Sequence, residues 1–380
     1  MTLLEETVIV TSDDFELPLR RLKSNLARPT AAVLLLHGAS SNADNFLHPN
    51  GGLAAYLAAR GFEVWLLDWR ASSLVVGNYG ADRDRAFTFD AAAANDIPAA
   101  LSHIRGVSQC EHLAALGHCI GGVCLSMAIA SGALAKFHVR EVVLSTIGLF
   151  FRAPIESFLK AEDGILERVR AQAPDCLGID ARDGAAWPEE LQRAYTSWPQ
   201  SLLPGGQTPA DDAYRRMTFL FGSPYLREAV AEDVHQRVAE LFGSLRLRLF
   251  IHAGQSLRRG HVAPFDAPEV GTYASAASSP YLDPTHFAPT QITLVTGKSN
   301  QLWHRESIDT MYEWLRNETR GAHRKHVLSG YAHQDLLLGE SAARDVYPLF
   351  AAGLSARGPA LQIAPSDPHW TTNQALSAAE

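Results

Sequence analysis

The chain has few of the features that mark nucleic-acid-binding or membrane-spanning proteins. Its 380 residues include 33 Lys and Arg against 41 Asp and Glu, a formal charge of -8, and no basic run exceeds two residues, as at Arg20-Arg21. This balance argues against nucleic acid as a partner. The apolar runs are much shorter than the roughly 20 residues that a membrane-spanning helix requires, so we expect no membrane span.

Cysteine is also scarce, and its spacing is uninformative. The four cysteines, Cys110, Cys119, Cys124 and Cys176, form no CxxC pattern. Neither a disulfide framework nor a metal site is therefore predicted. The N-terminus lacks the basic start and apolar core of a signal peptide, so we expect a cytoplasmic location, in which these cysteines are thiols. No Gly-x-Gly-x-x-Gly fingerprint occurs, so no flavin and no other cofactor is implied.

What the chain does have is a regular alternation of strand and helix patterns. Hydrophobic residues make up 47% of it and charged residues 19%, values typical of a globular enzyme. The apolar run 31–36, the helical pattern 52–59 and the apolar run 62–67 form a βαβ unit, which predicts a parallel sheet. Further strands are expected at 7–10, 17–22, 112–116, 139–149, 291–296 and 325–328, and a helix at 335–352. The fold class is therefore α/β, with a mostly parallel eight-stranded sheet flanked by helices.

The alternation lapses in the middle of the chain. Residues 151–290 are richer in Pro, Trp, Tyr and Phe, and their helical patterns are short. We interpret them as a helical cap inserted into a core formed by residues 1–150 and 291–356. The segment 357–380, rich in Pro and small polar residues, is expected to be a flexible tail.

A sharp turn from strand to helix surrounds Cys119. Residues 117–122 read Gly-His-Cys-Ile-Gly-Gly, between an apolar strand pattern and an apolar helix pattern. Glycines on both sides of such a turn allow the strained backbone of a nucleophile elbow, here with Cys in place of Ser. We expect the helix N-terminus to lower the pKa of the thiol. The alternative is that Cys119 is a small buried apolar residue.

A nucleophilic thiol needs a base, and His333 follows the last predicted strand. The loop after strand 291–296 would supply a third group to orient the imidazole, and the residue in register there is Asn300. Asn can accept a hydrogen bond from the imidazole but cannot stabilise imidazolium by charge. Asp335 and Asp283 are the alternative acids, and a missing third member is another.

Two backbone amides would hold the developing oxyanion. One is the N–H of Ile120, at the start of the helix, and the other is that of Ala39, after the strand that ends in His37-Gly38. The aromatic residues of the insertion are either plain core or the wall of an apolar substrate pocket.

The order of these motifs resembles that of the α/β-hydrolase superfamily over most of residues 1–355. The elbow, the Asn300 loop and residues 330–335, Gly-Tyr-Ala-His-Gln-Asp, look like the hydrolase domain fused to some cholesterol-oxidase-like (GMC) flavoproteins. His333-x-Asp335 is similar to the pattern of acid lipases, and G-x-C-x-G-G to that of polyhydroxyalkanoate synthases and dienelactone hydrolase. The resemblance implies acyl-transfer chemistry under a lid over a lipophilic pocket, and suggests a separate oxidoreductase of the same pathway as a partner.

The sequence thus predicts an enzyme that attacks an ester, thioester or lactone of a hydrophobic substrate. Cys119 would form a thioester acyl-enzyme with His333 as general base. Water as the second nucleophile would make it a hydrolase, and another acceptor would make it an acyltransferase or cyclase. The alternative from another class is a non-catalytic binding protein with the same fold.

Overall fold

The computed structural model describes residues 4–172, 176–178, 187–199, 202–268 and 279–355. The segment 357–380, predicted to be a tail, lies outside these ranges.

One eight-stranded sheet organises the chain, in the order β1-β2-β4-β3-β5-β6-β9-β10. Pairings β1–β2 and β2–β4 are antiparallel, and the others are parallel. This confirms the predicted mostly parallel sheet. The strands are β1 (Leu4–Val10), β2 (Glu16–Leu22), β3 (Ala31–Leu36), β4 (Phe62–Leu67), β5 (Leu113–His118), β6 (Val139–Ser145), β9 (Gln291–Gly297) and β10 (Arg324–Leu328).

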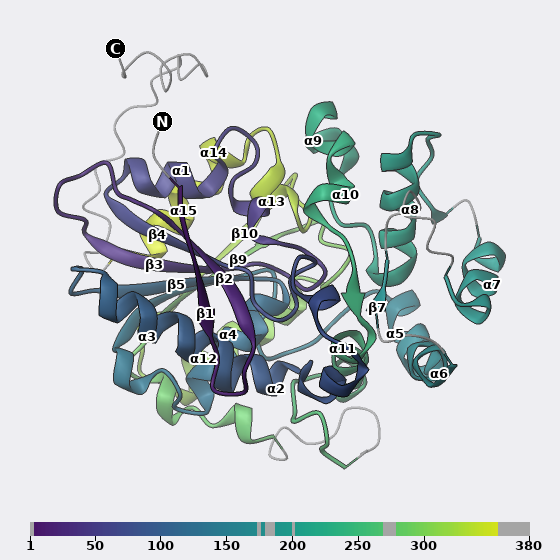
Figure 1. The fold of residues 1–380 in the computed structure, drawn as a ribbon, viewed down its shortest axis with the longest axis horizontal. Coiled ribbons are helices and arrows are strands. Elements are labelled where there is room, and N and C mark those ends of the chain that lie inside the picture. The colour runs from purple at the N-terminus through teal and green to yellow at the C-terminus, as the bar shows by residue number, and fades with distance from the viewer. Residues whose placement is uncertain (1–3, 173–175, 179–186, 200–201, 269–278, 356–380) are drawn as a thin grey trace.

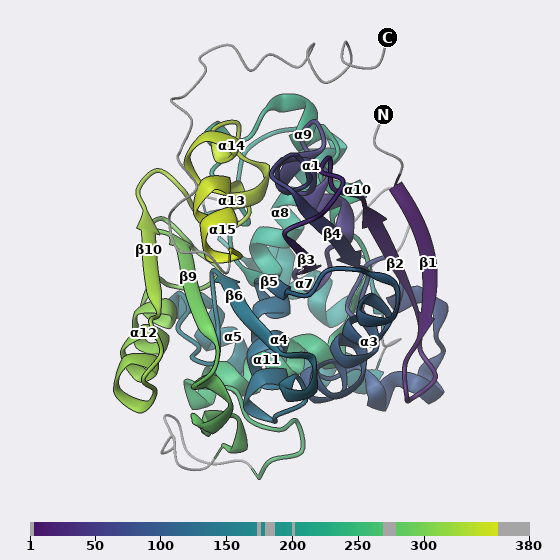
Figure 2. The same cartoon turned by 90° about the vertical axis from the view of Figure 1, so that its left-hand side faces the viewer.

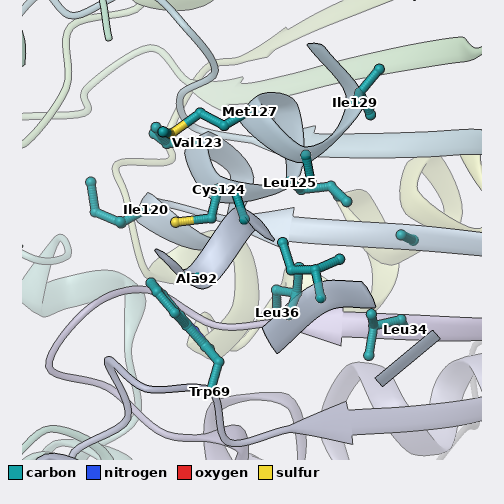
Figure 3. Close-up of a cluster of buried hydrophobic side chains, with 14 of the residues drawn as sticks. Leu34, Leu36, Trp69, Ala92, Ile120, Val123, Cys124, Leu125, Met127 and Ile129 are labelled. Carbon is teal, nitrogen blue, oxygen red and sulfur yellow. The ribbon is translucent and has the colours of Figure 1, made fainter. Parts of the chain in front are cut away.

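Helices cover both faces of the sheet (Figure 2). On one face lie α1 (Gly52–Ala59), α13 (Asp335–Leu338), α14 (Ala342–Asp345) and α15 (Tyr347–Gly353); on the other lie α3 (Ile97–Val107), α4 (Ile120–Ala130) and α12 (Glu306–Glu318). Because side chains alternate along a strand, Val33 and Leu35 of β3 join the core under the first layer, and Leu34 and Leu36 the core under the second. Figure 3 shows Leu36 in this second core together with Cys124 of α4.

Two predicted elements end differently in the structure. The strand expected at 139–149 stops at Ser145, because Thr146 has a φ of 78°, which breaks the extended backbone. The helix expected at 335–352 is divided into α13, α14 and α15. A π-helical turn from Ala92 to Asp96 separates the short helix α2 (Phe89–Ala91) from α3.

Residues 151–290 supply a group of mostly short helices that lies beside the sheet (Figure 1). Its strands pair only with each other and do not join the large sheet. The elements are α5 (Ile155–Asp163), α6 (Ile165–Gln172), β7 (Cys176–Leu177), α7 (Glu189–Ser197), α8 (Pro209–Phe221), α9 (Glu232–Gln236), α10 (Val238–Leu241), β8 (Leu245–Arg246) and α11 (Leu247–Arg259).

The C-terminal end of α8 is joined to the core of the molecule. Gln334 donates its backbone N–H to the carbonyl of Pro224 at 2.8 Å. Gly222 passes so close to the loop after β9 that a Cβ on it would lie 2.5 Å from the carbonyl oxygen of Gln301. This contact, the α8 seam, places the C-terminal end of α8 beside the loops that follow β9 and β10.

Candidate active site

Cys119 lies at the point where β5 turns into α4, in a backbone conformation that few non-glycine residues adopt. Its φ and ψ are 55° and -132°. Such a conformation costs of order 1–3 kcal/mol and persists only where the surroundings enforce it. Here the N–H of Cys119 donates to the carbonyl of Ser145 at 3.0 Å, and its own carbonyl accepts from Gly122 at 2.8 Å. The turn is thus fixed by β6 on one side and by α4 on the other.

The glycines around Cys119 are required by close backbone contacts. A Cβ on Gly117 would lie 2.5 Å from the Cα of Gly122, and one on Gly121 would lie 2.5 Å from the carbonyl oxygen of His37. Neither contact leaves room for a methyl group. The glycine pattern therefore reflects how tightly β3, β5 and α4 approach one another at the turn.

A cavity of about 120 Å³ opens above this turn. Cys119, His333, Ala39 and Ile120 all line it, so the structure brings these four predicted site residues to one place. Most of the remaining wall is apolar and comes from α5, α6, α8 and α11 of the insertion. An exception is Lys160, whose ammonium group donates to the carbonyl oxygen of Leu220 at 3.5 Å.

The thiol of Cys119 is buried and uncharged in this environment. Burial raises its pKa to about 11, although the backbone N–H of Ile120 and the indole N–H of Trp303 both act to lower it. The expected lowering by the helix N-terminus is therefore present but is outweighed. The reason is that desolvation of a thiolate in an apolar cavity costs more than two neighbouring N–H groups return.

His333 is fully buried and is also neutral. Burial, and to a lesser degree neighbouring His118, hold its pKa well below the usual value. The two rings meet edge to face with centroids 4.9 Å apart. Within the described part of the chain, neither ring nitrogen of His333 has a hydrogen-bond partner. The imidazole is thus available to accept a proton, but no described carboxylate orients it through a hydrogen bond.

Asn300 reaches the same edge of the sheet, but its side-chain oxygen is already engaged. That oxygen accepts the backbone N–H groups of Leu302 at 3.0 Å and Trp303 at 3.2 Å. The side-chain nitrogen is buried and has no partner among the described residues. The oxygen that we expected to bind the imidazole therefore shapes the loop after β9 instead.

The two alternative acids serve local roles. Both carboxylate oxygens of Asp335 lie within 3.0 Å of the backbone N–H of Ala332, so Asp335 fixes the loop that carries His333. Burial raises the pKa of this carboxyl to about 6. Asp283 is exposed, accepts the N–H of Thr285 at 2.9 Å and does not line the cavity. The structure therefore places neither carboxylate in a hydrogen bond with His333.

The two residues whose backbone N–H groups were expected to hold an oxyanion, Ala39 and Ile120, line the same cavity as the thiol. A Cβ on Gly38 would come within 3.4 Å of the sulfur of Cys119, so the segment before Ala39 passes directly over it. This segment is held by the indole N–H of Trp69, which donates to the carbonyl of His37 at 3.0 Å. The N–H of Ile120 is close enough to the sulfur to lower the pKa of the thiol.

Trp303 and His118 are site residues that the sequence did not single out. Trp303 lies in the loop after β9, where no periodicity marks it; its backbone N–H donates to the side chain of Asn300, and it lines the cavity. His118 occupies the variable position of the elbow, and its Nδ1 lies 3.0 Å from the hydroxyl of Ser145. Its position next to Cys119 was the one signal that could have found it.

The comparisons with known proteins agree with this fold. The profile described as "Alpha/beta hydrolase family" matches residues 33–376. The chain belongs to the alpha/beta hydrolase family.

Similar curated proteins are lipases. A tear acid lipase-like protein of Mesocricetus auratus is 31% identical over 174 residues, which are 43% of this chain and 42% of that protein. Gastric triacylglycerol lipase of Homo sapiens is 32% identical over 128 residues, 31% of this chain and 32% of that protein. The matched region thus spans less than half the length of these curated relatives.

Solved structures share the fold at low identity. A structure described as "Lipase (Open form)" aligns with a TM-score of 0.61 at 14% identity, covering 93% of this chain and 100% of the other. A carboxyl esterase from Bacillus coagulans aligns with a TM-score of 0.53 at 12% identity, covering 88% and 92%.

Other types of site find no support in the ranges that the structure describes. There, no three His, Cys, Asp or Glu side chains gather in a way that could hold a metal ion. No described helix is both long and apolar enough to cross a membrane.

Proposed function

We propose that this chain is an acyl-transfer enzyme that cleaves an ester, thioester or lactone of a hydrophobic acid through a thioester on Cys119. The observation that carries the proposal is the strained, glycine-flanked Cys119 facing an apolar cavity that His333 also lines. The curated relatives named as lipases support an ester with a hydrophobic acyl group as the substrate class.

The protonation states suggest how the first step proceeds. Because the thiol and the imidazole are both neutral at rest, the proton moves from sulfur to His333 as the sulfur attacks the carbonyl carbon. The carbonyl oxygen becomes an oxyanion held by the N–H groups of Ile120 and Ala39. The leaving group takes the proton from His333, which leaves a thioester on Cys119.

In the second step His333 takes a proton from the incoming nucleophile, which attacks the thioester. If the nucleophile is water, the enzyme is a hydrolase; an alcohol, amine or thiol would make it an acyltransferase or cyclase. The apolar cavity under the inserted helices limits access of water, which favours an acceptor other than water, whereas the curated relatives named as lipases favour hydrolysis. The likeness to flavoprotein-fused hydrolase domains supports a separate oxidoreductase of the same pathway as a partner. A cytoplasmic location is proposed independently of that likeness.

A second candidate is a binding protein without catalysis. It is favoured by the thiol pKa of about 11 and by the finding that no described carboxylate is hydrogen-bonded to His333, both of which slow acyl transfer. In this case the cavity binds an apolar ligand and Cys119 does not react with it.

Intact-protein mass spectrometry after brief incubation with an activated ester of a medium-chain acid separates the two candidates. The enzyme is expected to gain the mass of one acyl group, and Cys119→Ala is expected to gain none. Cys176→Ala removes a partly exposed thiol away from the turn and is the matched control, expected to acylate like the wild type. A wild-type protein without adduct, or an equal adduct on Cys119→Ala, would rule out the catalytic proposal.

A further inference from the structure

Trp303, which lines the cavity, carries a buried hydrogen-bond donor that no described residue accepts from in the resting protein. Its indole nitrogen is inaccessible to solvent and has no hydrogen-bond partner of ordinary geometry in the described part of the chain. A buried donor without a partner is costly, and in native proteins it calls for an explanation. Trp303 and Cys119 line the same cavity, and the indole N–H of Trp303 acts to lower the pKa of the Cys119 thiol.

The indole is held in place from two sides. Its ring meets that of Phe151 edge to face, with centroids 5.1 Å apart. The backbone N–H of Trp303 donates to the side-chain oxygen of Asn300 at 3.2 Å. The next residue, His304, donates its N–H to the carbonyl of Arg152 at 2.8 Å. The ring position is therefore set by the loop after β9 and by the chain that follows β6.

We propose that the indole N–H of Trp303 donates a hydrogen bond to the sulfur of Cys119 whenever that sulfur carries negative charge, and that Asn300 is the positioning residue that holds Trp303 there. This inference rests on the proposed role of Cys119 as the nucleophile. A neutral thiol is a weak acceptor, whereas a thiolate binds an N–H donor strongly. This donor, which no described residue uses in the resting protein, is thus matched to a charge that exists only during the reaction.

Negative charge develops on the sulfur twice in each cycle. In acylation the S–H bond breaks, the proton goes to His333 and the sulfur forms a bond to the carbonyl carbon. In deacylation the C–S bond of the tetrahedral intermediate breaks, its electron pair returns to sulfur, and the sulfur regains a proton from the imidazolium of His333. In both steps the Trp303 N–H lowers the energy of the negatively charged Cys119 sulfur. This matters because Asn300 carries no charge that could stabilise the imidazolium of His333.

The role assigned to Asn300 differs from the one that sequence register suggested. A residue that orients His333 would direct its oxygen to the imidazole, but this oxygen accepts from Leu302 and Trp303. Such a turn is a common use of the Asn side chain. Asn300 therefore acts on the sulfur through the loop that it shapes.

The test measures the reactivity of the thiol without any acyl substrate. The second-order rate of Cys119 alkylation by iodoacetamide is followed at pH 8 to 9 by mass spectrometry. Trp303→Phe keeps an aromatic ring and removes the N–H, and we expect alkylation to slow about tenfold, as for loss of a hydrogen bond to a charged group. Trp314→Phe is the matched control, because Trp314 packs on Phe287 outside the cavity and should leave the rate unchanged.

A double-mutant cycle tests the positioning role of Asn300. Asn300→Ala is expected to slow alkylation, and Asn300→Ser, which keeps a side-chain oxygen for the turn, to restore much of the rate. In a Trp303→Phe background Asn300→Ala should have no further effect, because its action passes through the indole. A full effect of Asn300→Ala in that background would overturn the positioning role.

The donor role is overturned if Trp303→Phe alkylates at the wild-type rate. If that variant does not fold, replacement of Trp303 by benzothienylalanine keeps the size of the indole, lacks its N–H and gives the same comparison. Failure of the proposed function is recognised separately, since it is an absence of acyl adduct on the wild type, whereas this test reads alkylation alone.

Discussion

The reactivity of Cys119 should depend steeply on pH, and this dependence distinguishes two kinds of cysteine site. In a preformed thiolate–imidazolium pair the thiol is already ionised near pH 6, so alkylation is insensitive to pH above that value. Here burial raises the pKa of the thiol to about 11 and lowers that of His333. We therefore expect a neutral pair whose thiolate fraction rises tenfold with each pH unit.

The size of the effect follows from the pKa. With a pKa of about 11, roughly one thiol in ten thousand is ionised at pH 7 and roughly one in a hundred at pH 9. Alkylation of Cys119 by iodoacetamide should accordingly accelerate about a hundredfold between these two pH values. No plateau is expected below pH 10.

The assay must locate the label, because the chain has no Lys or Arg between residues 106 and 135, so that Cys110, Cys119 and Cys124 share one tryptic peptide. Fragmentation of that peptide after a short pulse at each pH assigns the label to Cys119, and Cys119→Ser gives the background. An alkylation rate that stays constant from pH 6 to 9 would refute the neutral pair. It would mean that an ion pair already exists at rest.

Two further predictions concern the turn and the loop around the site. Gly121→Ala should lower the free energy of unfolding by about 1–3 kcal/mol and reduce acyl transfer, because its Cβ would lie 2.5 Å from the carbonyl oxygen of His37. Urea denaturation measures the loss of stability. Gly106→Ala is the control and is not expected to destabilise the chain, because its Cβ would meet nothing within 4 Å. Asp335→Asn should change how stability depends on pH. The pKa of Asp335 is raised to about 6 in the folded chain from 3.8, so its contribution to stability is complete below pH 3.8 and is lost as the pH rises through 6. The free energy of unfolding of the wild type minus that of Asp335→Asn, measured by thermal unfolding, should therefore be up to about 3 kcal/mol larger at pH 4 than at pH 7. The same difference at both pH values would contradict this prediction.

Much of the fold could be predicted because the determining signals are local. Apolar runs such as 31–36 and 62–67 are long enough to define buried strands, and the glycines around Cys119 mark a turn that only residues without a Cβ permit. His333 was found because the carboxyl ends of parallel strands meet at one edge of the sheet. Each of these inferences needs only the order of residues along the chain.

The electrostatics of the site could not be predicted in the same way. Whether the pKa of the Cys119 thiol is raised or lowered depends on how completely the inserted helices exclude water. This is a property of packing and not of the elbow motif. The partners of Asn300 depend on the path of the loop after β9, in which the backbone N–H groups of Leu302 and Trp303 reach its oxygen first. Register along the strand gave the position of the residue but not the direction of its side chain.

The α8 seam has a consequence for the surroundings of His333. The hydrogen bond from Gln334 to Pro224 joins the inserted helices to the residue next to His333. A movement that carries the end of α8 away from this loop must break that bond, although the bonds from Ala332 to Asp335 still hold the loop on its other side. Any change of contact at the α8 seam therefore alters the surroundings of the residue next to His333, so that the packing of the inserted helices and the position of the imidazole are linked through one backbone hydrogen bond.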